Sequence, residues 1–466
     1  MHLWFEWWKI VLQLRDACSR YRTFLWLGVV LAGFTIRVDL LGVTSIVRAL
    51  GLIECSYDRL LDFFHSNALS IQKLTQAWIN IALKNLPLLK RNERIVLVGD
   101  GIKIPKSGKK MPAVKKLFQE SESNTKPSYI FGHSFQTVGL LAGIMPGIFA
   151  IPLISRIHEG LILSNRDHRT LMDKMVELLL LIATQYPYYF VADTYYACKT
   201  VIHGVLKDGN HLISRVKTNA VAYELARPQK CKGKRGRKRM YGKKIKLITL
   251  FNKVEMMEKA QSPLHDEKGI MIRFLVQDLI WRRAAVMVRF VAVVHPTKGK
   301  VLLMSTDLSL SALEIIELYG LRFKIELSFK QAVREIGAYS YHFWMKDMKK
   351  IKRSGKNQYL HRNTEKYRKA VLRKIDAYHR FVQIGIIAQG LLQYLACCHT
   401  KLVWNSFGSW IRTIRPGILP SEMVTSIAMR NTFPEFLAGS NEKVNLVKFI
   451  VERIDIARTE GARLVA

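Results

Sequence analysis

The sequence predicts an α/β protein: a mixed sheet, interrupted by a β-rich insertion, with helical regions at both ends. Three observations support this prediction. The first 90 residues lack strand-like alternation, the next part alternates short apolar runs with helically spaced ones, and a basic, β-branched segment then interrupts that order. The expected division is 1–90 as a helical DNA-binding region, 91–217 with 300–380 as the sheet core, 218–299 as the insertion and 381–466 as a helical end.

Two short helices are expected inside the first region. Thr44 can cap a helix that runs to Leu50, and after Gly51 a second helix is expected from Ser56 to Phe64. Helix, glycine turn and helix is the outline of a helix-turn-helix DNA reader. A small helical bundle without DNA contacts gives the same pattern, so both interpretations stand at this point.

The sheet core is predicted to contain five short strands with helices between them. The first three form a meander, a helix follows with apolar residues from Leu171 to Ile182, and two more strands are separated by another helix. The expected strands are Ile95–Gly99, Phe135–Ala142, Gly147–Leu153, Tyr188–Ala192 and His211–Lys217. Such an order combines antiparallel and parallel pairs in one sheet.

The insertion begins with a strongly basic segment. Lys230 to Lys244 holds nine Lys or Arg in fifteen residues, with glycines between them, which is typical of a solvated loop that attracts polyanions. Further strands are expected at Met271–Val276, Val286–Val294 and Val301–Met304. A capping box at Ser311 and Glu314 then predicts one helix that continues past Arg334, and a second basic stretch, Lys346 to Arg362, follows.

Composition indicates a nucleic-acid partner. The 466 residues include 73 Lys and Arg against 36 Asp and Glu, a net charge of +37, together with 49% hydrophobic residues. That hydrophobicity excludes a disordered basic tail, and the positive field argues against small neutral substrates. The apolar run Phe24 to Ile36 is shorter than the about 20 residues that a membrane span needs, so no membrane partner is expected. Six cysteines without a CxxC pair fit a reduced protein of the cytoplasm.

Three acidic residues are the candidate catalytic groups. Asp100 and Asp193 directly follow predicted strands, where open α/β sheets place their sites. Glu326 lies in the later predicted helix, on one face with Tyr319, Arg322 and Lys330. Converging carboxylates repel one another unless cations neutralise them, and two Mg²⁺ ions can clamp a scissile phosphate. Taken singly, an Asp after a strand is common in turns, and a Glu near Arg and Lys is an ordinary helix ion pair.

Other residues offer weaker indications of DNA contact. Lys103, with Lys106 and two further lysines, follows Asp100 in an expected loop that can clamp phosphates or merely be solvated. Lys234, Arg235 and Arg237 are candidates in the basic loop, although Arg235-Gly-Arg237 lacks the proline usual in minor-groove hooks. His133 is more simply a structural histidine than a ligand. Trp281 and Trp344 can stack on a base or be core aromatics.

Three of these segments resemble a known family. Val98–Gly101, Val191–Tyr196 and Leu318–Lys330 are similar to the three signature blocks of bacterial insertion-sequence DDE transposases, in the branch with a Tyr, Arg, Glu, Lys motif. The resemblance spans about Ile95 to Lys330. It implies an RNase H-like core with a β insertion between the second Asp and the Glu, which here are 326 − 193 = 133 residues apart.

The resemblance also implies a reaction. Asp100, Asp193 and Glu326 would hold two Mg²⁺ or Mn²⁺ ions, and Tyr319 and Arg322 would contact phosphates near the cut end. The family's final lysine falls on Val333, and Lys330 lies nearly one turn earlier. The expected activity is cleavage at the inverted-repeat ends of an element and joining of the 3′-hydroxyl to target DNA.

The expected activity implies particular partners, and two alternative functions remain. The partners would be double-stranded DNA and a second copy of the chain in the end-joined complex, in the cytoplasm of a bacterium, near its nucleoid. A nuclease of the same chemistry that never joins ends remains an alternative. A catalytically inactive DNA-binding regulator is another, because its basic surface would bind DNA equally well.

Overall fold

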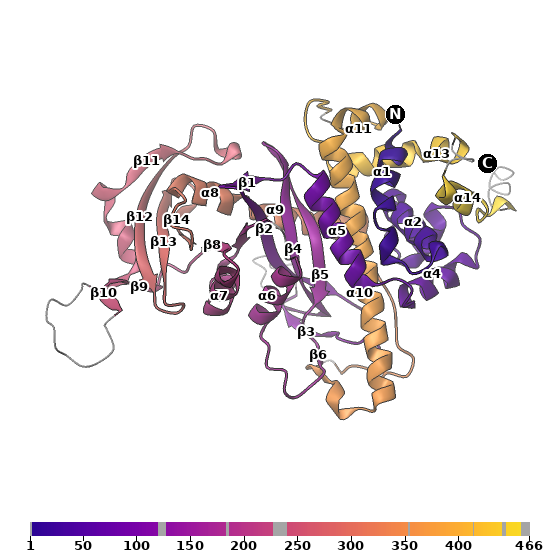
Figure 1. Ribbon diagram of the computed structural model, residues 1–466, viewed down its shortest axis with the longest axis horizontal. Coiled ribbons are helices and arrows are strands. Elements are labelled where there is room, and N and C mark those ends of the chain that lie inside the picture. Colours follow the sequence, from indigo (N-terminus) through magenta and orange to yellow (C-terminus); the bar gives the residue numbers. More distant parts are fainter. Residues whose placement is uncertain are drawn as a thin grey trace. The chain divides into compact units, whose positions relative to one another are not determined.

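The protein is described by a computed structural model that covers residues 2–119, 127–182, 186–226, 240–352, 355–412, 414–439 and 444–457 (Figure 1). The chain forms two compact units, which are described separately. Unit 1 comprises Met1–Leu89, Gly101–His168 and Glu326–Ala466, whereas unit 2 comprises Lys90–Asp100 and Arg169–Ile325. Strand β2 (Arg94–Pro105) contributes residues to both.

Unit 2 is built on a mixed sheet. Its strands follow the order β10-β9-β12-β13-β14-β8-β7-β2, with β1 beside β2 and β11 beside β12. Their bounds are β1 Lys90–Arg91, β7 Tyr188–Ala192, β8 His211–Arg215, β9 Val221–Leu225, β10 Tyr241–Lys246, β11 Glu258–Gln261, β12 Met271–Trp281, β13 Val286–His295 and β14 Gly299–Ser305.

The parallel part of this sheet consists of β2, β7 and β8. Gly99 of β2 pairs with Ala192 of β7, and Ala192 pairs in turn with Ser214 of β8. Every residue of β7 is buried, as expected for a strand covered on both faces. The carboxyl ends of the three strands therefore meet at one edge of the sheet.

The predicted insertion supplies the antiparallel part. β12 and β13 form a long hairpin whose turn contains Arg282 and Arg283, and β14 pairs with both β13 and β8. β12 extends five residues beyond the predicted Met271–Val276, because residues from Gln277 to Trp281 continue the ladder with β13.

The described part of unit 2 contains three α-helices. They are α6 Leu171–Leu181, α7 Lys199–Lys207 and α8 Ala312–Gly320. Two of them begin with a capping box, and the other, α7, packs against β8. Thr170 with Asp173 and Ser311 with Glu314 form complete capping boxes at the first turns of α6 and α8. α8 contacts β14, β8 and β7.

Unit 1 is mostly helical. Its helices are α1 Leu3–Leu12, α2 Tyr21–Ile36, α3 Val43–Ala49, α4 Ser56–His65, α5 Ile71–Asn85, α9 Phe323–Gln331, α10 Glu365–Cys398, α11 Thr400–Ser406, α12 Glu422–Asn431, α13 Phe433–Gly439 and α14 Asn445–Val451, with the first three residues of α9 counted in unit 2. Its strands are β3 Lys115–Phe118, β4 Tyr129–Ile144, β5 Gly147–Ile157, β6 Leu161–Ile162 and β15 Gln358–Tyr359. β3, β4 and β5 form an antiparallel meander.

The long helix α10 is the centre of unit 1, where it contacts α2, α4, α5, α12 and β5 (Figure 1). Its buried polar side chains bond to backbone carbonyls of these neighbours: Arg380 donates to Phe64 O and Leu69 O, and Gln383 donates to Leu153 O. Among the described helices, α10 alone has the length and hydropathy of a membrane span. Because 83% of that apolar window is buried within the protein, α10 resembles the core helix of a folded domain.

The predicted fold class is confirmed, with differences in detail. The chain is mixed α/β, and helices lie at both ends. From β2 to β8 the described strands and α-helices follow the order five strands, a helix, a strand, a helix and a strand, so β3 and β6 are added to the three strands expected before α6. The prediction of one helix from Ser311 past Arg334 is wrong. α8 ends at Gly320, α9 begins at Phe323, and a π-helical turn covers Ala332–Ile336.

Candidate active site

Asp100 and Asp193 lie at neighbouring positions on the edge where the parallel strands end. Gly99 and Ala192 are paired in register, so the residues that follow them lie on adjacent strands, which are about 4.8 Å apart in a sheet. Side chains at matching positions of parallel strands point to the same face. Both residues are half-buried. Asp100 lies within β2, because the strand continues to Pro105 rather than ending at Gly99.

The backbone around Asp193 is held by short-range bonds. A 3₁₀ turn, Thr194–Tyr196, starts directly after it, and one carboxylate oxygen of Asp193 accepts a bond from Tyr195 N at 3.0 Å. The carbonyl oxygen of Asp193 accepts from Ser214 Oγ at 2.8 Å. The strand end is therefore tied to β8, and the carboxylate is oriented at the beginning of the turn.

Three further side chains surround this pair of aspartates. Arg322 Nη1 lies 3.3 Å from Asp100 Oδ2, and both side chains are about four-fifths buried. Burial raises the pKa of Tyr319, and the charge of Asp193 raises it further, against the lowering effects of Arg322 and Arg215. Tyr319 therefore lies in the electrostatic field of Asp193, Arg322 and Arg215, and Arg322 lies beside Asp100.

Arg215 is a site residue that the sequence reasoning missed. It follows Ser214, which pairs with Ala192, so it occupies on β8 the position that Asp193 occupies after β7. The expected strand ran to Lys217 and placed Arg215 inside it, whereas β8 ends at Arg215 itself. A charged residue that closes an apolar run was the signal that could have revealed it.

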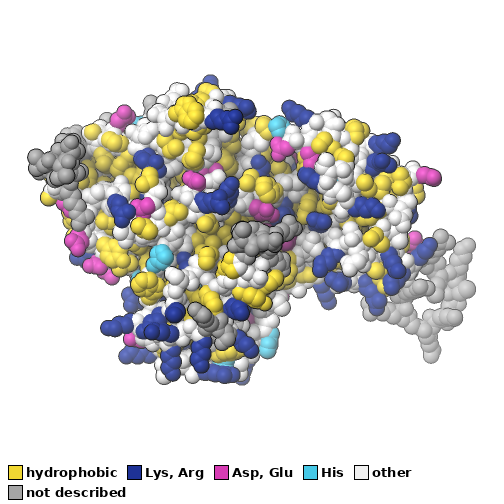
Figure 2. All heavy atoms as spheres, turned by 180° about the vertical axis from the view of Figure 1, so that it is seen from behind, with side chains coloured by type: hydrophobic (Ala, Val, Ile, Leu, Met, Phe, Trp, Pro, Cys, Tyr) yellow, Lys and Arg dark blue, Asp and Glu magenta, His cyan; other side chains and the backbone are white. Residues whose placement is uncertain are grey.

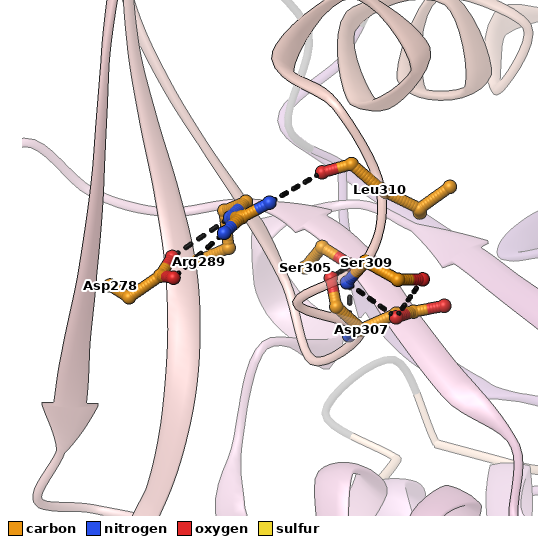
Figure 3. A network of polar contacts seen from close by, with 6 residues as sticks. All are labelled: Asp278, Arg289, Ser305, Asp307, Ser309 and Leu310. Carbon is orange, nitrogen blue, oxygen red and sulfur yellow. Dashed lines mark hydrogen bonds and ion pairs between the residues drawn. The ribbon is translucent and has the colours of Figure 1, made fainter.

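Helix α8 is fixed on the sheet by ion pairs that set the position of Tyr319. Arg91 Nη2 donates to both carboxylate oxygens of Glu317, at 2.9 and 2.7 Å. Ahead of the helix, Arg289 binds Asp278 with two bonds of 2.8 Å and donates to Leu310 O at 2.9 Å (Figure 3).

The turn between α8 and α9 interrupts the segment that carries Tyr319, Arg322, Glu326 and Lys330. Arg322 N donates to Tyr319 O and Ile325 N donates to Arg322 O, so the chain tightens into bonds between residues three apart. At Gly320, an added Cβ would clash with a methyl group of Leu264, so a larger residue would require the Leu264 side chain to move. The expectation of one continuous helical face from Tyr319 to Lys330 is therefore wrong.

Glu326 and Lys330 are exposed residues of α9. Both are counted in unit 1, and both aspartates are in unit 2. Within the described parts of the chain, no three His, Cys, Asp or Glu side chains are grouped so that they could hold a metal ion. The structure thus brings together two of the three predicted carboxylates, and the role of Glu326 stays a prediction.

Asp307, a further conspicuous carboxylate after a strand, has a structural role. It lies at the other edge of the sheet, because β14 runs antiparallel to β8 and Ser305 pairs with Ile213. Its oxygens accept a bond from Tyr189 Oη at 2.7 Å. They also accept bonds from the backbone and hydroxyl of Ser309, at 2.8 and 2.7 Å (Figure 3). These bonds lower the pKa of Asp307 against the effect of its burial, and they shape the turn before α8.

The lysines after Asp100 are not a loose phosphate clamp. Lys103 is exposed, but it is part of β2 and donates to Phe118 O at 2.7 Å. Lys106 is buried, with its ammonium 3.7 Å above the ring of Tyr341 and 3.0 Å from Tyr341 O. Burial lowers the pKa of Lys106 to about 7. β2 runs to Pro105, so Lys103 lies in the strand and Lys106 lies in the expected loop that follows it.

The remaining candidates divide between core and surface. His133 is fully buried between Pro112 O and Tyr341 Oη, which confirms its structural role. Trp281 is a buried aromatic beside Phe290, whereas Trp344 is 61% exposed. The basic-loop candidates Lys234, Arg235 and Arg237 lie outside the described residues.

A cationic lobe is visible on unit 1 where the second basic stretch leads into α10 (Figure 2). We define the lobe by its exposed Lys and Arg side chains. They are Lys346, Lys349, Lys350, Lys352, Lys356, Arg362, Lys366, Lys369 and Arg373. Exposed carboxylates in the same segment are limited to Asp347 and Glu365. The predicted basic stretch therefore forms a positive surface.

The sequence was compared with known families. Residues 20–262, more than half of the chain, match the family described as DDE superfamily endonuclease. The chain belongs to this family. The segment of this DDE endonuclease that matches contains Asp100 and Asp193, and it ends before Tyr319 and Glu326.

The chain was also compared with curated proteins and with solved structures. A search of curated proteins finds no match for this DDE endonuclease. Among solved structures, it is similar to a cryo-EM structure of the piggyBac transposase synaptic complex with hairpin DNA. The two share 11% identity, with a TM-score of 0.37, over 95% of this chain and 81% of that one.

Proposed function

We propose that this DDE endonuclease is a DNA transposase that cuts DNA at the ends of an insertion sequence and joins the freed 3′-hydroxyl to target DNA. The observation that carries the proposal is that Asp100, within β2, and Asp193, directly after β7, occupy matching positions on adjacent parallel strands. Two carboxylates on one edge, faced by Arg322 and Arg215, form a site for a phosphodiester rather than for a neutral substrate.

The donor set fits a divalent cation. Mg²⁺ is usually bound by one or two carboxylates together with water and substrate phosphate, and Asp100 and Asp193 supply two carboxylates on adjacent strands. Glu326 is proposed as a third ligand. Bound Mg²⁺ or Mn²⁺, in a pair of ions, would supply activation of the attacking oxygen and stabilisation of the leaving one.

The protein's own residues would bind and orient the DNA. Tyr319, held on α8 by the Arg91–Glu317 pair, and Arg322, beside Asp100, would contact phosphates next to the scissile bond. Arg322 also offsets the repulsion between neighbouring carboxylates when no cation is bound. In strand transfer, the same groups would orient the 3′-hydroxyl end instead of water.

The basic surfaces would bind the rest of the DNA. Phosphate contacts by Lys and Arg position a protein on DNA without reading its sequence, and the cationic lobe offers nine such side chains. Within unit 1, Arg22, Arg59 and Arg373 line a pocket of about 450 Å³, although Asp62 shares it. α4, the second helix of the expected helix-turn-helix, also exposes Asp58, so its contacts with DNA stay a prediction.

The biological setting is part of the proposal. We place the enzyme in the branch with the Tyr, Arg, Glu, Lys motif, in the bacterial cytoplasm near the nucleoid. Double-stranded DNA would be the partner, as inverted-repeat ends and as target. Because joining two ends requires both to be held at once, two copies of the chain would act together.

The test is a cleavage and joining assay with the full chain. Duplex DNA from the flanks of the coding region is incubated with wild type, Asp100→Asn and Asp193→Asn in Mg²⁺ or Mn²⁺, and DNA binding is measured in parallel. We expect cut and joined products with wild type and a loss of at least a thousandfold, about 4 kcal/mol in activation free energy, with each variant. Binding should stay within a few-fold.

The matched control removes one carboxylate elsewhere in unit 2. The side chain of Asp266 is fully exposed, so Asp266→Asn should cut like wild type. Nicked ends that are never joined would show a nuclease without strand transfer and would refute the transposase. Undiminished binding without any cutting by wild type would instead identify a DNA-binding regulator.

A further inference from the structure

A pocket of about 700 Å³ lies beside Asp193 in unit 2, and none of the roles described so far involves it. Its wall includes Thr194, the residue directly after Asp193. Pockets of about 300–1,000 Å³ are large enough to hold a small ligand or part of a larger one. The pocket is therefore roomy enough for a nucleotide unit and not only for a single ion.

The lining is cationic. Lys217, two residues beyond the end of β8, contributes an ammonium, and Arg282 and Arg283 in the β12–β13 turn contribute two guanidinium groups. Asn219 adds an amide. Among the described residues that line the pocket there is no carboxylate, so its field favours an anion.

One of these cations is held against an aromatic ring. The guanidinium carbon of Arg282 lies 5.9 Å from the ring centre of half-buried Tyr223, and Nη1 lies 3.5 Å from Tyr223 Oη. A guanidinium has five N–H donors in a planar fork that matches phosphate oxygens. Stacking on Tyr223 restricts Arg282, so less entropy is lost when it binds an anion.

We propose that this pocket binds the sugar-phosphate backbone of the DNA strand being cut, on one side of the scissile phosphate. Lys217, Arg282 and Arg283 contact consecutive phosphates, and Tyr223 packs against a sugar. The proposal rests on the proposed function, because a strand held at Asp193 must continue past Thr194. A strand with one charge per nucleotide fits three neighbouring cations better than a small dianion does.

The proposal gives the β insertion a positioning role. Arg282 and Arg283 of the β12–β13 turn line the pocket together with Lys217, which follows β8, and Thr194, which follows β7. These residues act on the position of the strand and not on the reacting atoms. A defect should therefore appear in binding and in KM, with kcat at saturating DNA changed less.

The first measurement is DNA binding without divalent cations, so that no cutting occurs. A 30-base-pair duplex is titrated with the full chain at several salt concentrations, comparing wild type with the double variant Arg282→Ala, Arg283→Ala. Loss of two phosphate contacts should lower the slope of log K against log salt by about 1.8 and weaken binding about 10- to 100-fold at low salt. The control is Lys259→Ala, Lys268→Ala, which removes two exposed lysines of the same insertion.

The second measurement locates the contact. Single phosphates of an element-end duplex are replaced by neutral methylphosphonates, and wild type should lose affinity at two or three consecutive positions on one side of the cut. The arginine variant should no longer respond at those positions. Equal weakening by the control, or an unchanged methylphosphonate pattern in the arginine variant, would overturn the proposal.

The two proposals fail in distinguishable ways. If wild type binds through the pocket but never cuts DNA, the proposed reaction is wrong and the pocket stands. If wild type cuts and joins while the arginine variant binds, responds to methylphosphonates and turns over as wild type does, the reaction stands and the pocket proposal is wrong.

Discussion

Arg37 supports the segment that follows the α9 helix, and its replacement gives a sharp prediction. Its side chain is 2% exposed, with Nε 3.1 Å from Ile336 O and Nη2 2.9 Å from Gly337 O, the last carbonyls of the π-helical turn. A further nitrogen donates to Ser45 Oγ at 2.9 Å. Arg37→Met keeps much of the volume and removes every donor.

The expected cost follows from the carbonyl left behind. A buried acceptor without a partner costs about 1–3 kcal/mol. Ser340 N also donates to Gly337 O, so only the carbonyl of Ile336 is orphaned, and the expected cost is about 2 kcal/mol. Native-state hydrogen exchange provides a local assay, because Ala338 N donates to Ala332 O across this turn. A loss of about 2 kcal/mol should speed exchange at Ala338 roughly 30-fold.

Arg48→Met is the matched control for Arg37→Met. Arg48 pairs with Asp39 at 2.8 Å, but its side chain is 58% exposed, and such surface pairs contribute about 1 kcal/mol or less. Exchange at Ala338 should then change less than about fivefold. If Arg37→Met changed exchange no more than Arg48→Met does, the idea that Arg37 holds the end of the α9 segment would be refuted.

Three other predictions concern charge. Burial lowers the pKa of Lys106 to about 7, whereas a lysine in the unfolded chain has a pKa of about 10.4. Between these two pH values the unfolded chain binds more protons than the folded chain. The free energy of unfolding should therefore rise with pH in this range, by at most about 1.4 kcal/mol per pH unit. Lys106→Met should abolish that rise in urea unfolding between pH 7 and pH 10, and an unchanged slope would contradict this origin. Arg322→Met removes the guanidinium 3.3 Å from Asp100 that would contact the phosphate, so cleavage should fall about 100-fold or more, while Arg322→Lys, which keeps the charge, should lose less; equal rates for wild type and Arg322→Met would contradict that role. Lys349→Ala with Lys350→Ala should lower the salt slope of DNA binding by about two, and an equal slope would exclude phosphate contacts by this part of the cationic lobe.

The sequence predicted the site most accurately where local pattern and geometry coincide. The run Tyr188–Ala192 is apolar throughout, which indicates a strand covered on both faces, and the Asp that follows such a strand must lie at the sheet edge. Asp193 was placed correctly for that reason. The expectation that Asp100 directly follows a strand is wrong, because β2 continues to Pro105, but the register of β2 with β7 still places Asp100 beside Asp193.

Prediction failed where distant contacts decide the conformation. Gly320 packs against Leu264 from the insertion, 56 residues earlier, and the tight turn beside it separates α8 from α9. No helical periodicity reveals such a contact. Lys106 looked like a solvated lysine because the sequence does not show that Tyr341 covers it. The pocket beside Asp193 likewise combines residues from three separate turns.

The discontinuity of unit 1 has a consequence for how the protein is made. α10 packs on β5, which is completed at Ile157, yet α10 begins only at Glu365, 365 − 157 = 208 residues later. At about 5–20 residues per second, a ribosome would leave the apolar surface of β5 uncovered for roughly ten to forty seconds. Unit 1 can therefore close only late in translation. A chain that stops before α10 would expose this surface permanently, so truncated products should aggregate or be degraded instead of persisting as soluble competitors of the full-length protein.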